Sequence, residues 1–159
     1  MLRFPLVALV LAALALPAAA QSASCPVTGI VTGDFGTGTG LGSPVHLSVA
    51  LDAAGCSLKF LVQPLGPDAP ISDHFILYGT SPLPVPFLLP SPFWVPGCFL
   101  DVAPLDALGA FPGDTSVIAL PPSPALVGAT IYFEAVHEYA VLSPMPLFGD
   151  TQGVKVQFQ

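Results

Sequence analysis

Proline constrains the fold of this chain more than any other residue. The sequence contains 20 prolines, and since only Pro5 and Pro17 lie before residue 21, the other 18 are spread over 21–159. Each proline removes a backbone N–H donor and clashes with the preceding turn of a helix. Long helices are therefore nearly excluded, although 125–143 is a stretch of 19 residues without proline.

Between the prolines, apolar residues alternate with polar or small ones. Over 45–52 the apolar residues fall at every second position, and the alternation resumes over 56–63. A period of two is typical of a strand with one buried face. The intervening Asp52-Ala53-Ala54-Gly55 has the composition of a turn, with Gly55 suited to a positive φ, so we expect a β-hairpin.

Further candidate strands lie at 74–78, 85–89, 98–103, 115–120, 130–141 and 153–158. Seven to nine short strands at this spacing predict an all-β fold, an antiparallel β-sandwich of the jelly-roll or Ig-like type. Over 125–143 a helix is the alternative. The β-branched and aromatic residues at 130–133 favour a strand there, preceded by one helical turn at 123–126.

Two stretches do not follow the strand pattern. Five glycines in ten residues over 33–42 predict a flexible loop or a wide bend. The segment 81–97 contains six prolines, which suits an extended edge or crossover segment and excludes a central strand. Prolines along an edge also protect it from pairing with another chain.

The N-terminus has the three parts of an export signal. Arg3 supplies the positive charge, 4–16 is apolar, and an Ala-x-Ala pattern ends at Ala20. The sequence thus predicts a signal peptide at 1–20 and a single β-sandwich domain at 21–159, secreted or extracytoplasmic (periplasm or cell surface). The apolar run is shorter than the roughly 20 residues that span a bilayer, so we expect no membrane insertion. Lipid attachment at Cys25 is disfavoured because Ser22-Ala23-Ser24 makes a poor lipobox.

The charge balance beyond residue 20 excludes some partners. Lys59 and Lys155 face ten carboxylates, which gives a net charge of 2 − 10 = −8. Nucleic acids are bound by clustered Lys and Arg, and two distant lysines form no such patch. Anionic membrane surfaces are disfavoured for the same reason.

Two short signatures resemble a known group of proteins. Pro96-Gly97-Cys98-Phe99-Leu100, and Pro124-Ala125-Leu126-Val127-Gly128 followed by Ile131-Tyr132, are similar to paired motifs in uncharacterised bacterial secreted proteins rich in Leu, Pro and Gly. The resemblance covers most of 25–159 and implies a β-sandwich without known activity. This sequence departs from that pattern at Cys56 and at His137-Glu138.

Three cysteines in an exported chain predict one disulfide and one free thiol. Loop entropy does not choose between the pairings, because the loops that end at Cys98 are worth roughly 4 kcal/mol whether they begin at Cys25 or Cys56. The resemblance implies Cys25 with Cys98, which leaves Cys56 free as a small apolar residue.

Residues that could carry chemistry are few. Glu134, His137 and Glu138 lie within five residues, but on a strand His137 points away from the two carboxylates, so we expect solvated carboxylates beside a packed or rim histidine. The chain has no H-E-x-x-H or G-x-S-x-G motif, and the glycines at 36–42 match no phosphate loop. Loop carboxylates suited to calcium are Asp68, Asp73, Asp114 and Asp150. We assign no catalytic residue, metal or cofactor.

The aromatic residues Phe87, Phe93 and Trp94 form a possible ligand platform for sugar rings or extended peptides, although core packing is the commoner fate of such residues. The sequence thus favours a secreted, non-catalytic module with a structural, adhesion or binding role toward an unknown extracellular protein or polysaccharide. One alternative is a carbohydrate-binding module that uses this platform. Another is a small metal-dependent hydrolase built on Asp73, His74, His137 and Glu134.

Overall fold

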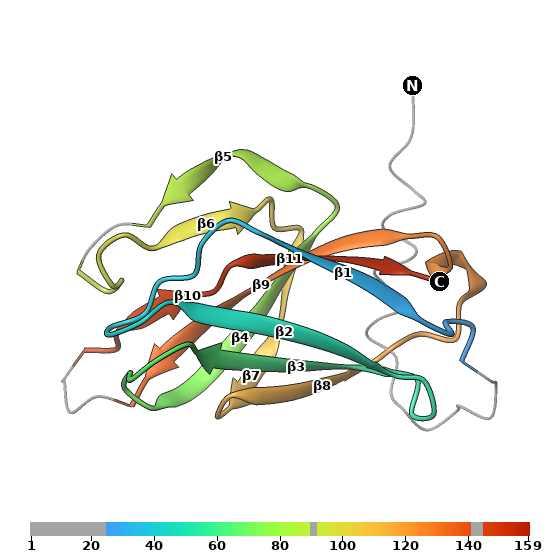
Figure 1. The fold of residues 1–159 in the computed structure, drawn as a ribbon, viewed down its shortest axis with the longest axis horizontal. Coiled ribbons are helices and arrows are strands. Elements are labelled where there is room, and N and C mark those ends of the chain that lie inside the picture. Colours follow the sequence, from blue (N-terminus) through green and yellow to red (C-terminus); the bar gives the residue numbers. More distant parts are fainter. Residues whose placement is uncertain (1–24, 90–91, 141–144) are drawn as a thin grey trace.

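The computed structural model describes residues 25–89, 92–140 and 145–159. The predicted signal peptide lies outside these residues. Within them the chain forms eleven strands and one 3₁₀ turn (Figure 1): β1 (Ile30–Phe35), β2 (Val45–Asp52), β3 (Ser57–Pro64), β4 (Ile71–Gly79), β5 (Pro82–Leu88), β6 (Phe99–Val102), β7 (Asp106–Pro112), β8 (Thr115–Ala119), η3 (Pro124–Leu126), β9 (Thr130–Tyr139), β10 (Phe148–Asp150) and β11 (Gly153–Phe158).

The strands form three antiparallel sheets. The main sheet has the order β1-β11-β9-β4-β7, with β10 also paired to β9, and the small sheet has the order β2-β3-β8. The third sheet is a ribbon of β5 and β6. In Figure 1 the β5–β6 ribbon lies along the top and the small sheet along the bottom, with β9 and β11 between them. The predicted all-β sandwich is confirmed.

The core lies between the main and small sheets. Phe60 of β3 meets Phe133 of β9 edge to face, with ring centroids 5.1 Å apart. Alternate residues of the hairpin point into this core, because Val45 and Leu47 on β2 are fully buried while His46 between them is not. The predicted hairpin is therefore confirmed, with register partners from Val45↔Pro64 to Asp52↔Ser57.

The turn of this hairpin differs from the prediction at one residue. Cys56 has the positive φ, of 46°, in place of Gly55. The Asp52 carboxylate accepts hydrogen bonds from the N–H groups of Ala54 and Gly55 at 3.1 and 3.0 Å. Cys56, the residue with a left-handed backbone conformation, therefore lies directly before β3.

A disulfide joins Cys25 to Cys56, with Cα atoms 5.1 Å apart. The predicted pairing of Cys25 with Cys98 is therefore wrong. Cys25 packs against the core between the two sheets, whereas Cys98 is buried in a separate cluster with Val95 and Tyr139. Cys98 is the free cysteine, and Cys56, predicted to be free, forms the bond.

The proline-free stretch forms a strand and not a helix. β9 runs through the middle of the main sheet, and η3 precedes it as the predicted helical turn, with Ser123 Oγ accepting a hydrogen bond from the Ala125 N–H. Residue 141, the last of the predicted strand, lies outside the described part of the chain. No helix among the described residues is long and apolar enough to cross a membrane.

Three strands were not predicted, so the described residues hold eleven strands where seven to nine were expected. The last residues of β1 overlap the start of the glycine-rich stretch 33–42, which was predicted to be a loop or bend. β1 has no alternation because most of its residues are exposed on the edge of the main sheet. β7 includes Gly109 at a φ of 47°, and its pairing with β4 shifts register. β10 has only three residues.

Candidate functional site

The β5–β6 ribbon and the residues just after β5 carry several exposed apolar side chains. Val85 is 74% exposed, Phe87 59%, Leu88 57% and Phe93, just beyond the strand, 45%. Soluble proteins rarely leave a contiguous apolar patch without a partner. We call residues 82–89 with Phe93 the ribbon face, and it is the candidate functional site.

A bulge in β5 contributes to this exposure. Pro82 pairs with Val102 and Phe87 pairs with Leu100, so the four residues 83–86 lie opposite the single residue Asp101. Extra residues in one strand leave their neighbours unpaired and bend the strand. Val85, the most exposed of these residues, lies within this bulge.

Prolines block the outer edge of β5. The odd-numbered residues of this segment face β6, because Leu89 N–H donates to the Cys98 carbonyl at 2.9 Å and Ala103 N–H donates to the Ser81 carbonyl at 3.2 Å. Between these two bonds Pro82, Pro84 and Pro86 have no N–H, so β5 has few backbone donors left for a further strand. Among the described strands β5 pairs with β6 alone, as predicted for an edge segment. A partner would have to use the side chains and not the backbone edge.

The three residues of the predicted ligand platform differ in their exposure to solvent. Phe87 and Phe93 are exposed. Trp94 is half-buried, and its ring packs against Phe148 with centroids 5.5 Å apart. Its backbone forms a bridge to the same residue. Two of the three rings are thus accessible to a ligand, and ligand binding by them stays a prediction.

The ribbon face has almost no hydrogen-bonding side chains. Residues 82–89 are all Pro, Leu, Val or Phe. Sugars need directed hydrogen bonds as well as a stacking ring, whereas apolar side chains of another protein need only a complementary surface. The composition of the face favours a protein partner over a polysaccharide.

Glu134 fixes the ribbon to the main sheet. One of its carboxylate oxygens, Oε2, accepts hydrogen bonds from the N–H groups of Asp101 and Val102 on β6, both at 2.8 Å. The side chain is 0% exposed, because the ribbon covers the outer face of β9. Burial raises the pKa of Glu134 to about 8, against the lowering effect of the two hydrogen bonds. Within the described residues its other oxygen, Oε1, has no hydrogen-bond partner.

Asp150 provides a second anchor. Its Oδ2 accepts from the Phe99 N–H at 3.0 Å, and its Oδ1 accepts from the Thr39 N–H at 3.1 Å. Burial raises the pKa of Asp150 to about 6. Together the two carboxyl groups bind three N–H groups of β6, so side chains take the place of a neighbouring strand on the edge of β6 that faces away from β5.

Solvated carboxylates were expected on β9, and for Glu134 this expectation is wrong. Its burial depends on the ribbon, which crosses β9 from a segment about thirty residues earlier in the chain. No local signal in the sequence shows this crossing. The expectation of a packed histidine is confirmed, because His137 is fully buried.

The four residues proposed for a metal-dependent hydrolase do not form one group, although His74 and His137 are neighbours. His74 and His137 are register partners that point into the interior, whereas Glu134 lies on the opposite face of β9. Both ring nitrogens of His74 are engaged, Nδ1 with the Gly113 carbonyl at 2.8 Å and Nε2 with Ser116 Oγ at 2.9 Å. In the described part of the chain no three His, Cys, Asp or Glu side chains are placed to hold a metal, and this includes the loop carboxylates considered for calcium.

His137 differs from His74 in its surroundings. Neither ring nitrogen of His137 has a hydrogen-bond partner among the described residues, and burial lowers its pKa to about 4. Its ring packs edge to face on Tyr139, with centroids 4.9 Å apart. Within the described part of the chain, His137 is thus a buried ring held by packing.

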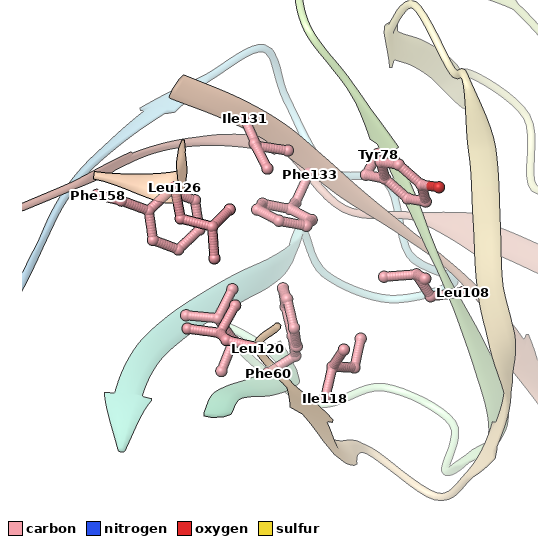
Figure 2. Close-up of a pocket in the computed structure, with 10 residues that line it drawn as sticks. Phe60, Tyr78, Leu108, Ile118, Leu120, Leu126, Ile131, Phe133 and Phe158 are labelled. Carbon is pink, nitrogen blue, oxygen red and sulfur yellow. The ribbon is translucent and has the colours of Figure 1, made fainter. Parts of the chain in front are cut away.

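An apolar cavity of about 20 Å³ lies between the main and small sheets (Figure 2). It is lined by residues such as Phe60, Phe133 and Phe158. This volume is about that of one water molecule, and an apolar lining keeps such a space dry. The cavity is a gap in packing and has no room for an organic ligand.

Comparison of the chain with protein-family models, curated proteins and solved structures finds no match. The resemblance to secreted Leu-, Pro- and Gly-rich modules therefore stays a prediction. The site must be interpreted from its own geometry.

Proposed function

We propose that this protein is a secreted, non-catalytic β-sandwich module that binds an extracellular protein through the ribbon face. The observation that carries the proposal is the group of exposed apolar side chains on a strand whose backbone edge is closed by proline. An exposed patch of this kind marks an interaction surface. Because prolines remove N–H donors from this strand, a partner is expected to bind the side chains and not the backbone.

Two observations support secretion. Residues 1–20 have the composition of a signal peptide. Cys25 and Cys56 form a disulfide, and disulfides persist mainly in oxidising compartments outside the cytoplasm.

The charge distribution supports an apolar partner surface. No Lys, Arg, Asp or Glu occurs between residues 81 and 100, although the chain beyond residue 20 has a net charge of 2 − 10 = −8. Interface centres are depleted of charge and enriched in aromatic residues. The partner is therefore expected to offer apolar side chains and to need no basic patch.

The test is selection of peptides from a displayed library on the folded domain. The variant Val85→Ser/Phe87→Ser/Leu88→Ser removes most of the exposed ribbon face, and Val31→Ser/Val117→Ser removes two exposed apolar side chains elsewhere. We expect peptides with apolar consensus positions that bind the wild type and the control alike and lose at least about tenfold in affinity for the ribbon variant. Equal binding to the ribbon variant would overturn the proposal.

The same proteins can be sedimented with insoluble cellulose, chitin and xylan. Retention that depends on Phe87 and Phe93, with no peptide selected, would support the carbohydrate-binding alternative in place of the present proposal. The protein proposal expects no such retention.

A further inference from the structure

A second hollow lies away from the ribbon face, between the end of β1 and the start of β2. It has a volume of about 260 Å³ and is lined by Asp34, Phe35, Thr37, His46, Gln152 and the adjoining glycine backbone. Pockets for drug-sized ligands begin at about 300 Å³, so this hollow suits a smaller molecule. Unlike the ribbon face, it combines polar groups with an aromatic ring.

Hydrogen bonds fix the tautomer of His46. The buried Gln152 side chain is oriented by the backbone of Leu47, since Gln152 Oε1 accepts from the Leu47 N–H at 3.0 Å and Nε2 donates to its carbonyl at 3.2 Å. The same Nε2 lies 3.0 Å from His46 Nδ1. Because an amide nitrogen can only donate, His46 Nδ1 must accept, and the ring proton of neutral His46 is on Nε2. His46 therefore offers an N–H donor on the side of its ring away from Gln152.

Phe35 is held as a fixed ring at this hollow. Tyr132 packs against it edge to face, with centroids 5.6 Å apart and planes at 77°. A Cβ at Gly153 would overlap the Phe35 ring, so the absence of a side chain there gives the ring its position. Phe35 is half-buried and lines the hollow.

Asp101 holds the loop after β1, which contains Gly36 and Thr37, by a hydrogen bond. Its Oδ2 accepts from the Thr37 N–H at 3.3 Å. Gly36 has a φ of 70°, and a Cβ on it would overlap the Asp101 carboxylate. The loop is thus held against the body of the protein, with Asp34 exposed at its start.

We propose that this hollow binds a single neutral sugar ring. His46 donates a hydrogen bond, the Asp34 carboxylate accepts one, and the Thr37 hydroxyl can do both, which matches hydroxyl groups that donate and accept. Phe35 supplies the apolar surface for the C–H face of a pyranose. An anion would be repelled by Asp34, and the His46 N–H has no acceptor to meet on an ammonium group. This site is independent of the ribbon face.

The proposal is tested by recording ¹H–¹⁵N spectra of the mature domain during titration with glucose, galactose, mannose and N-acetylglucosamine. We expect saturable shifts at the amides of 34–38 and of Leu47 with at least one sugar. Asp34→Ala and His46→Leu should each weaken binding about tenfold. The matched controls, Asp114→Ala at a distant exposed carboxylate and Ser48→Ala two residues along β2, should leave it unchanged.

Three results would overturn this assignment. The first is a folded protein with no saturable shift for any of these sugars, and the second is equal weakening by the control variants. The third is tighter binding of tetramethylammonium than of every sugar, which would indicate a cation site. The ribbon variant should keep its sugar shifts, so failure of one proposal leaves the other separately testable.

Discussion

Glu134 is a fully buried carboxyl group with hydrogen bonds on one oxygen and none, among the described residues, on the other. Burial raises its pKa from the ordinary 4.5 to about 8, so the neutral form favours the folded state. Its contribution to stability is complete below pH 4.5 and is lost as the pH rises through about 8. Asp150 behaves likewise, with a folded pKa of about 6.

The first prediction concerns Glu134→Gln. The amide keeps an oxygen for the two N–H groups of β6 and cannot ionise, so we expect a flatter fall in melting temperature between pH 4.5 and about 8 than in the wild type. Thermal unfolding by circular dichroism across this range measures it. Glu138→Gln on the same strand is the control. Parallel curves for the wild type and Glu134→Gln would contradict the assignment.

His137 gives the second prediction, with the opposite sign in pH. Its folded pKa of about 4 lies below the ordinary 6.5, so the wild type loses stability as the pH falls from 6.5 to 4. His137→Leu removes two nitrogens without described partners at similar volume, and we expect a gain of about 1–3 kcal/mol, largest near pH 4.

His74→Leu is the matched control for this change. It leaves Ser116 and the Gly113 carbonyl without their partner, so it should destabilise the protein by a similar amount. Denaturant unfolding of both variants gives the comparison. Loss of stability in both would show that His137 is satisfied in the folded protein.

At the scale of elements, the outer edge of β5 is kept from pairing by its prolines. The third prediction is that Pro84→Thr/Pro86→Thr restores two N–H donors on this edge and causes concentration-dependent association with a gain of β-signal. Light scattering and thioflavin fluorescence measure it. Pro122→Thr, in an exposed loop, should remain as the wild type; association of both variants would show that proline loss alone is responsible.

The fourth prediction concerns the link between the N-terminal end of the described chain and the β2–β3 turn. Cys25→Ser should lower the free energy of unfolding by about 4 kcal/mol, because the bond closes a loop with a sequence separation of 31. Alkylation followed by intact mass should find no reactive thiol in the native protein and one after unfolding. A linked peptide that contains Cys98 would contradict this pairing.

At the scale of the whole molecule, local pattern predicted the fold class and its central parts. The β2–β3 hairpin, β9 and the edge position of β5 follow from alternation and from proline, which act within a few residues. β1 and β10 were missed because an exposed edge and a three-residue strand produce no alternation. The partners of Cys25 and Glu134 depend on how distant segments cross, which no local pattern encodes.

Of the two candidate surfaces, the ribbon face could be predicted in part from the sequence and the hollow beside His46 could not. The apolar composition of the ribbon face is visible in the sequence, and the exposure of Phe87 and Phe93 is what the structure adds. The hollow beside His46 could not be predicted, because it depends on Gln152, more than a hundred residues away in the chain. Only the folded molecule brings Asp34, His46 and Gln152 together.

The pairing of Cys25 with Cys56 has a consequence for the order of oxidation. In a chain exported from its N-terminus, these two cysteines emerge before Cys98. The native bond is then the first that can form, and it needs no later exchange by an isomerase. On this order of emergence Cys98 would not be needed for the native bond, and in the folded structure its thiol is buried.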